Sequence, residues 1–187
     1  MSDYVITTDS NSDVLPEFIK ENDLTIIPQY YSFGDTVYGD ELNMPPHEFY
    51  ETMRKGELPK SQANNPAVIR DKFEKILKDG KNILHIAFSS ALSGSCNNVI
   101  MTANELLEDY PDRKITVFDS LNASLGEGVS VYRAVELWKE GKSMEEVYDV
   151  LMEERDHVNV SFTVNDLYHL QRGGRVSKTT AVVGSLI

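Results

Sequence analysis

Cysteine is almost absent from this sequence: Cys96 is the one cysteine among 187 residues. A single cysteine cannot form an intramolecular disulfide or a zinc site with several cysteine ligands within this chain, and it fits a reducing compartment. The first ten residues, MSDYVITTDS, lack the basic and apolar regions of a signal peptide. No run of 18 apolar residues is present either. We therefore expect a cytoplasmic protein without stable membrane insertion.

Positive charge is also scarce. The chain has 18 Lys and Arg against 30 Asp and Glu, which gives a formal net charge of −12. Nucleic-acid binding needs clustered positive charge, so this balance argues against it. The sequence has no G-x-x-x-x-G-K-S/T loop, no G-x-G-x-x-G and no G-x-S-x-G elbow. Its scattered Asp, Glu and His residues show no metal-ligand spacing, and we expect no metal site.

Beta-branched and amphipathic segments alternate along most of the chain. Strands are expected at 4–7, 24–28, 82–88 and 114–118, and helices at about 16–21, 45–55, 66–79, 94–109, 122–140 and 143–154. Gly34-Asp35 indicates a hairpin or ordered loop, and the breaker-rich segment 56–66 a loop. SMEE at 143–146 has the pattern of a capping box. The alternation predicts an α/β fold, with a parallel sheet sandwiched by helices.

The pattern changes at about Val158. Residues 158–164, VNVSFTV, are expected to form a strand, and NDLYHL a short helix that begins at a capping Asn or Asp. A glycine break and an apolar tail follow. We therefore expect an α/β lobe at 1–157 and the start of an incomplete second α+β lobe at 158–187.

Small polar residues follow three of the expected strands: Asp9-Ser10, Ser89-Ser90 and Asp119-Ser120. In parallel α/β sheets, ligands bind beyond the carboxyl ends of the strands, so these residues could share one crevice. The alternative is that each residue caps the helix that follows. We expect capping by Asp9 and Asp119, and the two roles can coexist.

The turn Ser93-Gly94-Ser95 precedes a long expected helix. Free N–H groups and the positive end of the helix dipole bind anions there, Gly94 permits close approach, and serine hydroxyls add donors. Arg172-Gly173-Gly174-Arg175 could hold a carboxylate or phosphate through its two guanidinium groups. Taken in isolation, this arginine motif is better interpreted as a solvated turn.

Five motifs together resemble the DegV family of bacterial fatty-acid-binding proteins. They are YVITTDSNSDV, PKSQANNP, HIAFSSALSGSCNN, ITVFDSLNASLGEG and FTVNDLYHLQRGGRVSKTTAVVGSLI, in the order and at the spacing usual for the family. The resemblance implies two lobes with a long-chain fatty acid between them. It also implies delivery of that fatty acid to a separate kinase for phospholipid synthesis, with no cofactor besides the bound lipid. Family members extend beyond this sequence, into the rest of the second lobe and a late histidine.

The resemblance also implies which residues hold the fatty-acid carboxylate. They are Ser93, Gly94 and Ser95 in the turn, the arginines of the motif from Arg172 to Arg175, and a hydroxyl in the loop at 59–66. An ungapped alignment from Pro59 to Pro66 places Ser61 at the family's threonine, whereas alignment on the Ser-Gln pair places Lys60 there. Ser95 stands where the family usually has threonine.

Two other functions are compatible with the residues. A serine-dependent hydrolase or phosphotransferase could use Ser93 or Ser10 with Asp9 or Asp119, because such a site is spatial rather than sequential. The chain could also serve only as an interaction lobe for a kinase partner. A carrier remains the preferred interpretation, because a long apolar ligand with one charged end needs a compact cluster of donors.

Overall fold

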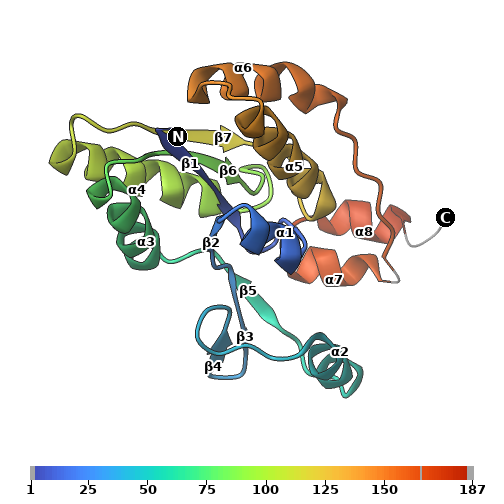
Figure 1. Ribbon diagram of the computed structural model, residues 1–187. Helices are drawn as coiled ribbons and strands as arrows, with labels where there is room; N and C mark the ends of the chain where they lie inside the picture. The colour runs from blue at the N-terminus through green and yellow to red at the C-terminus, as the bar shows by residue number, and fades with distance from the viewer. Residues whose placement is uncertain (1–2, 165, 185–187) are drawn as a thin grey trace.

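The computed structural model describes residues 3–164 and 166–184, and a four-stranded sheet forms its centre (Figure 1). The strands are β1 (Tyr4–Asp9), β2 (Thr25–Ile27), β6 (Asn82–Ala87) and β7 (Ile115–Asp119). They lie in the order β2-β1-β6-β7, and all three pairings are parallel. Parallel neighbours need crossover connections, which the intervening segments supply. The predicted α/β fold is confirmed.

Helices cover both faces of this sheet. They are α1 (Pro16–Glu21), α3 (Pro66–Lys78), α4 (Ser95–Asp109), α5 (Leu125–Lys139) and α6 (Met144–Glu154). Successive side chains of a strand point to opposite faces. Along β6, Leu84 and Ile86 therefore pack with α5 and α6, whereas Ile83 packs with α3 and α4. Burial on both sides explains why β6 is apolar almost throughout.

The helix ends follow their local sequence signals. Ser143 accepts a hydrogen bond from the Glu146 N–H, and Glu146 accepts one from the Ser143 N–H, so the predicted capping box is confirmed. Gly80 and Gly141 follow α3 and α5 with φ values of 77° and 83°. This left-handed conformation suits glycine and ends a helix.

A second, antiparallel sheet has the strand order β4-β3-β5. It contains β3 (Tyr30–Phe33), β4 (Thr36–Tyr38) and β5 (Lys60–Gln62), and α2 (Pro46–Arg54) lies beyond it (Figure 1). Of the two alternatives at Gly34-Asp35, the hairpin is the one present, because β3 pairs antiparallel with β4. The prediction that 56–66 is entirely loop is wrong for β5, whose Ser61 pairs with Tyr31 of β3. Backbone pairing with a distant strand forms β5 between the flanking breakers, and no short-range pattern reports that pairing.

The strand predicted at 158–164 is wrong: these residues have no regular secondary structure. A strand needs a neighbour to pair its backbone groups, and an alternating pattern does not supply one. Phe162 is 75% exposed. The expected short helix is confirmed as α7 (Leu167–Arg172), which Asp166 caps through the Tyr168 N–H.

The remaining described segment of the chain is α8 (Lys178–Gly184), which lies beside α7 (Figure 1). Asn165, the alternative cap for α7, and residues 185–187 of the apolar tail lie outside the described residues. Within the described parts of the chain, no helix has the length and apolar character needed to cross a membrane. The boundary between 157 and 158 stays a prediction.

Candidate functional site

The polar residues that follow the strands lie at one edge of the parallel sheet. Asp9 Oδ2, at the end of β1, accepts a hydrogen bond from the Phe88 N–H at 2.9 Å. Ser90 donates to Asp119 Oδ2 at 2.5 Å, which links the ends of β6 and β7. Ser120 donates to the Ala87 carbonyl at 2.8 Å. Three loops that are far apart in the sequence are thereby tied together.

Neither aspartate caps the helix that follows it. The N-cap of α1 is Leu15 and that of α5 is Ser124, so the expected capping role of Asp9 and Asp119 is wrong. The connecting loops place several residues between each strand end and the next helix. The aspartates instead join neighbouring loops, and Asp119 also accepts from the Leu121 N–H.

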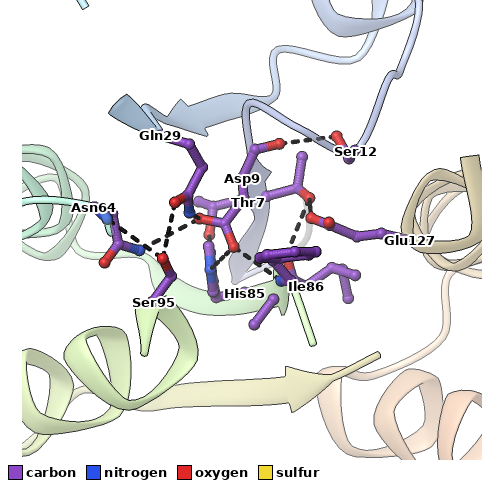
Figure 2. Close-up of polar contacts among 12 residues, drawn as sticks. Thr7, Asp9, Ser12, Gln29, Asn64, His85, Ile86, Ser95 and Glu127 are labelled. Atoms are coloured by element: carbon purple, nitrogen blue, oxygen red, sulfur yellow. Dashed lines mark hydrogen bonds and ion pairs between the residues drawn. The ribbon is translucent and has the colours of Figure 1, made fainter. Parts of the chain in front are cut away.

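Asp9 is fully buried, yet four groups contact its carboxylate (Figure 2). The Phe88 N–H, Gln29 and Asn64 donate to it, and His85 Nε2 lies 3.7 Å from Oδ2. Burial raises the pKa of Asp9. The neighbouring His85 imidazole and the hydrogen bonds from Phe88 and Gln29 more than offset burial, so the pKa of Asp9 lies below its ordinary value.

The Ser93-Gly94-Ser95 turn opens α4, and its residues differ in exposure. Ser95 is fully buried, Ser93 half-buried and Gly94 exposed. Gly94 is the N-cap residue, and no side chain caps the helix there. A Cβ added to Gly94 would meet no atom within 4 Å. Packing within the described chain therefore does not require glycine at this position, which leaves its backbone open to a ligand.

A cleft of about 960 Å³ lies between the antiparallel sheet and α7. Ser10, Ser61, Arg172 and Arg175 contribute polar groups to its wall, as do Asp13, Lys60 and His169. Its apolar wall comes from the aromatic and aliphatic residues of β3, α2 and the adjoining loops, namely Tyr31, Met44, Phe49, Tyr50 and Leu58. The cleft therefore combines an apolar surface with polar groups that include Lys60, Arg172 and Arg175.

The arginine motif adjoins the serine turn. Arg175 Nε donates to the Leu92 carbonyl at 3.3 Å, immediately before Ser93. Arg175 also donates to the Gly173 carbonyl, whereas Arg172 pairs with Asp166 at 3.1 Å. Of the predicted carboxylate ligands, Ser61, Arg172 and Arg175 line the cleft, whereas Ser93, Gly94 and Ser95 do not. The bond from Arg175 to Leu92 is what brings the serine turn next to a lining residue.

A buried carboxyl group, Glu127 of α5, lies behind this edge of the sheet. Its Oε1 is 3.0 Å from the Thr8 hydroxyl (Figure 2). Burial, followed by the charge of Asp9, raises the pKa of Glu127 to about 9. The next residue, Gly128, lies close to the loop that follows β1. A Cβ added at Gly128 would be 2.5 Å from the Ser12 carbonyl oxygen. Glycine at 128 therefore allows α5 to approach and place Glu127 there.

No hydrogen bond joins Ser93 or Ser10 to a histidine among the described residues. Ser93 Oγ lies 2.9 Å from Ser95 Oγ, and Ser10 Oγ accepts from the Gln29 N–H. His85 is fully buried, with its Nδ1 2.9 Å from the Thr7 hydroxyl. Within the part of the chain that the structure describes, no three His, Cys, Asp or Glu side chains gather as metal ligands.

Sequence reasoning did not identify Gln29, Asn64 or Glu127 as part of this site. Gln29 follows β2 after one residue, so the rule that polar residues after parallel strands share an edge could have found it. Asn64 lies in a loop whose path depends on β5, and Glu127 has the appearance of an ordinary helix residue. Neither carries a local signal of its position.

Comparison with known proteins defines the class to which this chain belongs. The family described as "Uncharacterised protein, DegV family" matches residues 3–187, and the chain therefore belongs to the DegV family. A DegV domain-containing protein of Clostridium perfringens is 39% identical over 189 residues, covering all of this chain and 65% of that protein. One from Lactococcus lactis is 34% identical over 185 residues, covering 98% of this chain and 64% of that protein.

Solved structures show the same fold. A stearic acid-binding protein from Eubacterium ventriosum has a TM-score of 0.84 and 31% identity, over 97% of this chain and 63% of that one. A fatty-acid-binding DegV family protein from Thermus thermophilus has a TM-score of 0.84 and 30% identity, over 98% of this chain and 64% of that one. The chain thus spans slightly less than two thirds of the length of these relatives.

Proposed function

We propose that this chain binds a long-chain fatty acid in the cleft and presents it, in the cytoplasm, to a fatty acid kinase for phospholipid synthesis. It acts as a carrier without a cofactor, not as a catalyst. One observation carries the proposal: a single cleft is lined both by apolar side chains and by Ser61, Arg172 and Arg175. The fatty-acid-binding proteins of the same fold support it.

The shape and chemistry of the cleft suit such a ligand. Its volume of about 960 Å³ lies within the range of roughly 300–1,000 Å³ found for small-molecule sites. Tyr31, Phe49 and Tyr50 offer aromatic surface to an acyl chain. Removing apolar surface from water stabilises the complex by roughly 25 cal/mol per Å² before the costs of association.

The polar groups in and beside the cleft suit a carboxylate. An ionised head group that enters the cleft loses water and needs several donors in exchange. The Ser93 hydroxyl, the open backbone at Gly94 and the Arg175 guanidinium lie at adjoining segments, since Arg175 bonds to Leu92. Hydrogen bonds to charged groups each contribute roughly 1.5–3 kcal/mol.

Native mass spectrometry of the bacterially expressed chain tests the proposal. We expect co-purified acyl chains and a saturable titration with oleate. Ser93→Ala should weaken oleate binding about tenfold or more, as the loss of one charged hydrogen bond predicts. Ser143→Ala is the matched control, because Ser143 also stands at a helix start but at α6, outside the cleft. No lipid and no titration would refute fatty-acid binding.

A separate measurement tests the carrier role. The oleate-loaded chain, mixed with a fatty acid kinase catalytic protein and ATP, should support acyl phosphate formation, and the Ser93→Ala variant should support less. Covalent labelling of Ser93 or Ser10 by a fluorophosphonate probe would instead favour a serine-dependent hydrolase. Binding to the kinase without any lipid would leave only an interaction role.

A further inference from the structure

A network of hydrogen bonds connects buried Asp9 to the Ser93 hydroxyl, and Figure 2 shows it as far as Ser95. Gln29 donates from Nε2 to Asp9 Oδ1 at 3.0 Å, and its Oε1 accepts from Ser95 Oγ at 2.8 Å. Ser95 Oγ in turn lies 2.9 Å from Ser93 Oγ. Asn64 donates two further hydrogen bonds within this network. Its side-chain NH₂ donates to Asp9, and its backbone N–H donates to Ser95 Oγ at 3.3 Å.

The chemistry of the end groups sets the direction of every bond in this network. Asp9 has a pKa below its ordinary value, so its Oδ1 acts as an acceptor, as Oδ2 does towards the Phe88 N–H. The amide of Gln29 must therefore turn its NH₂ group to Asp9 and its oxygen to Ser95. Ser95 has one hydroxyl proton, which this oxygen holds, so towards Ser93 it can act only as an acceptor.

This direction separates the two serines of the turn. Ser95 is fully buried, and its proton is committed to Gln29. Ser93 is half-buried, and its Oγ also accepts a hydrogen bond from the Ser95 N–H at 3.2 Å. Its proton can therefore turn from Ser95 Oγ to a ligand while Ser95 still holds the oxygen in place. Ser95 keeps the Asn64 N–H as a donor when this happens, so the change leaves no buried polar atom of Ser95 unpaired.

We propose that Gln29 and Ser95 are positioning residues, which anchor the Ser93 hydroxyl to the buried Asp9 carboxylate and hold it ready for the fatty-acid head group. Ser95 then acts through Ser93, without touching the ligand. The inference rests on the proposed fatty-acid function for its ligand, but the hydrogen-bond network can also be examined without lipid. The proposed positioning is limited to the Ser93-Gly94-Ser95 turn, because Ser61 reaches the cleft from a different element, β5.

A double-mutant cycle with oleate measures this dependence. Gln29→Met keeps the side-chain length but removes both hydrogen bonds. In the wild type, Ser93→Ala should weaken oleate binding about tenfold, whereas in the Gln29→Met background it should do so less than about threefold. Ser61→Ala should have the same effect in both backgrounds. Tyr4→Phe is the control, because it removes a hydrogen bond at the opposite end of β1 and should be additive with Ser93→Ala.

Two outcomes of this cycle would overturn the proposal. The first is that Ser93→Ala weakens oleate binding as much in the Gln29→Met background as in the wild type. The second is that Ser61→Ala also loses its effect on oleate binding in that background, which would indicate that Gln29→Met disturbs the whole site. Ser95→Ala replaces Gln29→Met in the cycle if the latter does not fold, with the same expectations.

A ligand-free measurement separates this proposal from the proposed function. In ¹⁵N–¹H spectra, the side-chain NH₂ protons of Gln29 should exchange with solvent far more slowly than those of exposed Gln62, because Asp9 holds them in a buried site. Equal exchange would overturn the hydrogen-bond network whether or not lipid binds. Slow exchange in a protein that does not bind oleate would refute the proposed function and leave the anchoring of Ser93 standing.

Discussion

The Thr8 hydroxyl lies 3.0 Å from Glu127 Oε1 and 3.0 Å from the Ile86 carbonyl oxygen. Thr8 has a single hydroxyl proton for these two neighbours. A protonated Glu127 that donates to Thr8 would let Thr8 donate its own proton to the Ile86 carbonyl, in keeping with the raised pKa of Glu127, about 9. The buried pair joins β1 to α5 behind the cleft and makes the stability of the fold depend on pH.

Glu127→Gln should reduce this pH dependence. The folded pKa of Glu127, about 9, lies above its ordinary value of 4.5. Its stabilising contribution is therefore complete below pH 4.5 and is lost as the pH rises towards 9, by up to about 1.4 kcal/mol per pH unit. Glutamine stays neutral and can donate to Thr8. Urea unfolding at pH 5 and pH 8 should show the variant gaining stability relative to the wild type at the higher pH; a constant difference would contradict a protonated Glu127.

Asp9→Asn should destabilise the fold at neutral pH and matter less in acid. The folded pKa of Asp9 lies below its ordinary value of 3.8. Its contribution is thus present above pH 3.8 and is lost as the pH falls through the folded pKa. We expect a loss of about 1.5–3 kcal/mol in the free energy of unfolding at pH 7. Asp112→Asn, at an exposed position, serves as the control, and an equally small effect of both variants would count against the buried network.

Alanine substitutions at Gly128 and Gly94 should affect different properties, protein stability at Gly128 and oleate binding at Gly94. At Gly128 the new Cβ would lie 2.5 Å from the Ser12 carbonyl oxygen, so Gly128→Ala should cost more than about 2 kcal/mol in unfolding free energy. At Gly94 it meets no atom within 4 Å, so Gly94→Ala should change stability by less than about 1 kcal/mol yet weaken oleate binding. Thermal unfolding and oleate titration measure both, and unchanged affinity in Gly94→Ala would show that no ligand approaches that backbone.

Arg175→Ala should weaken oleate binding about tenfold or more, because Arg175 lines the cleft and lies beside the serine turn. Arg175→Lys should restore only part of the affinity, since lysine keeps the charge but loses the planar set of donors. Arg113→Ala is the control, because Arg113 bonds to the Gly80 carbonyl, away from the cleft residues. Equal affinities of the Arg175 and Arg113 variants would remove Arg175 from the carboxylate site.

Local sequence patterns predicted much of the fold. The parallel sheet, the capping box at Ser143 and the hairpin at Gly34 were predictable because each depends on neighbouring residues or on burial with a regular period. The prediction failed where a distant partner decides the outcome. β5 forms because β3 lies beside it, whereas 158–164 has an alternating pattern but no strand among the described residues to pair with it.

The sequence by itself determined the alternation of strands and helices, the polar residues at the strand ends and the serine turn before α4. Only the tertiary structure decided that Asp9 is a buried acceptor instead of a helix cap, and that Ser95 faces Gln29 while Ser93 stays half-exposed. The physical reason is that hydrogen-bond direction and burial depend on which side chains meet in space. Residues such as Gln29 and Glu127 acquire their roles from partners 66 and 119 positions away.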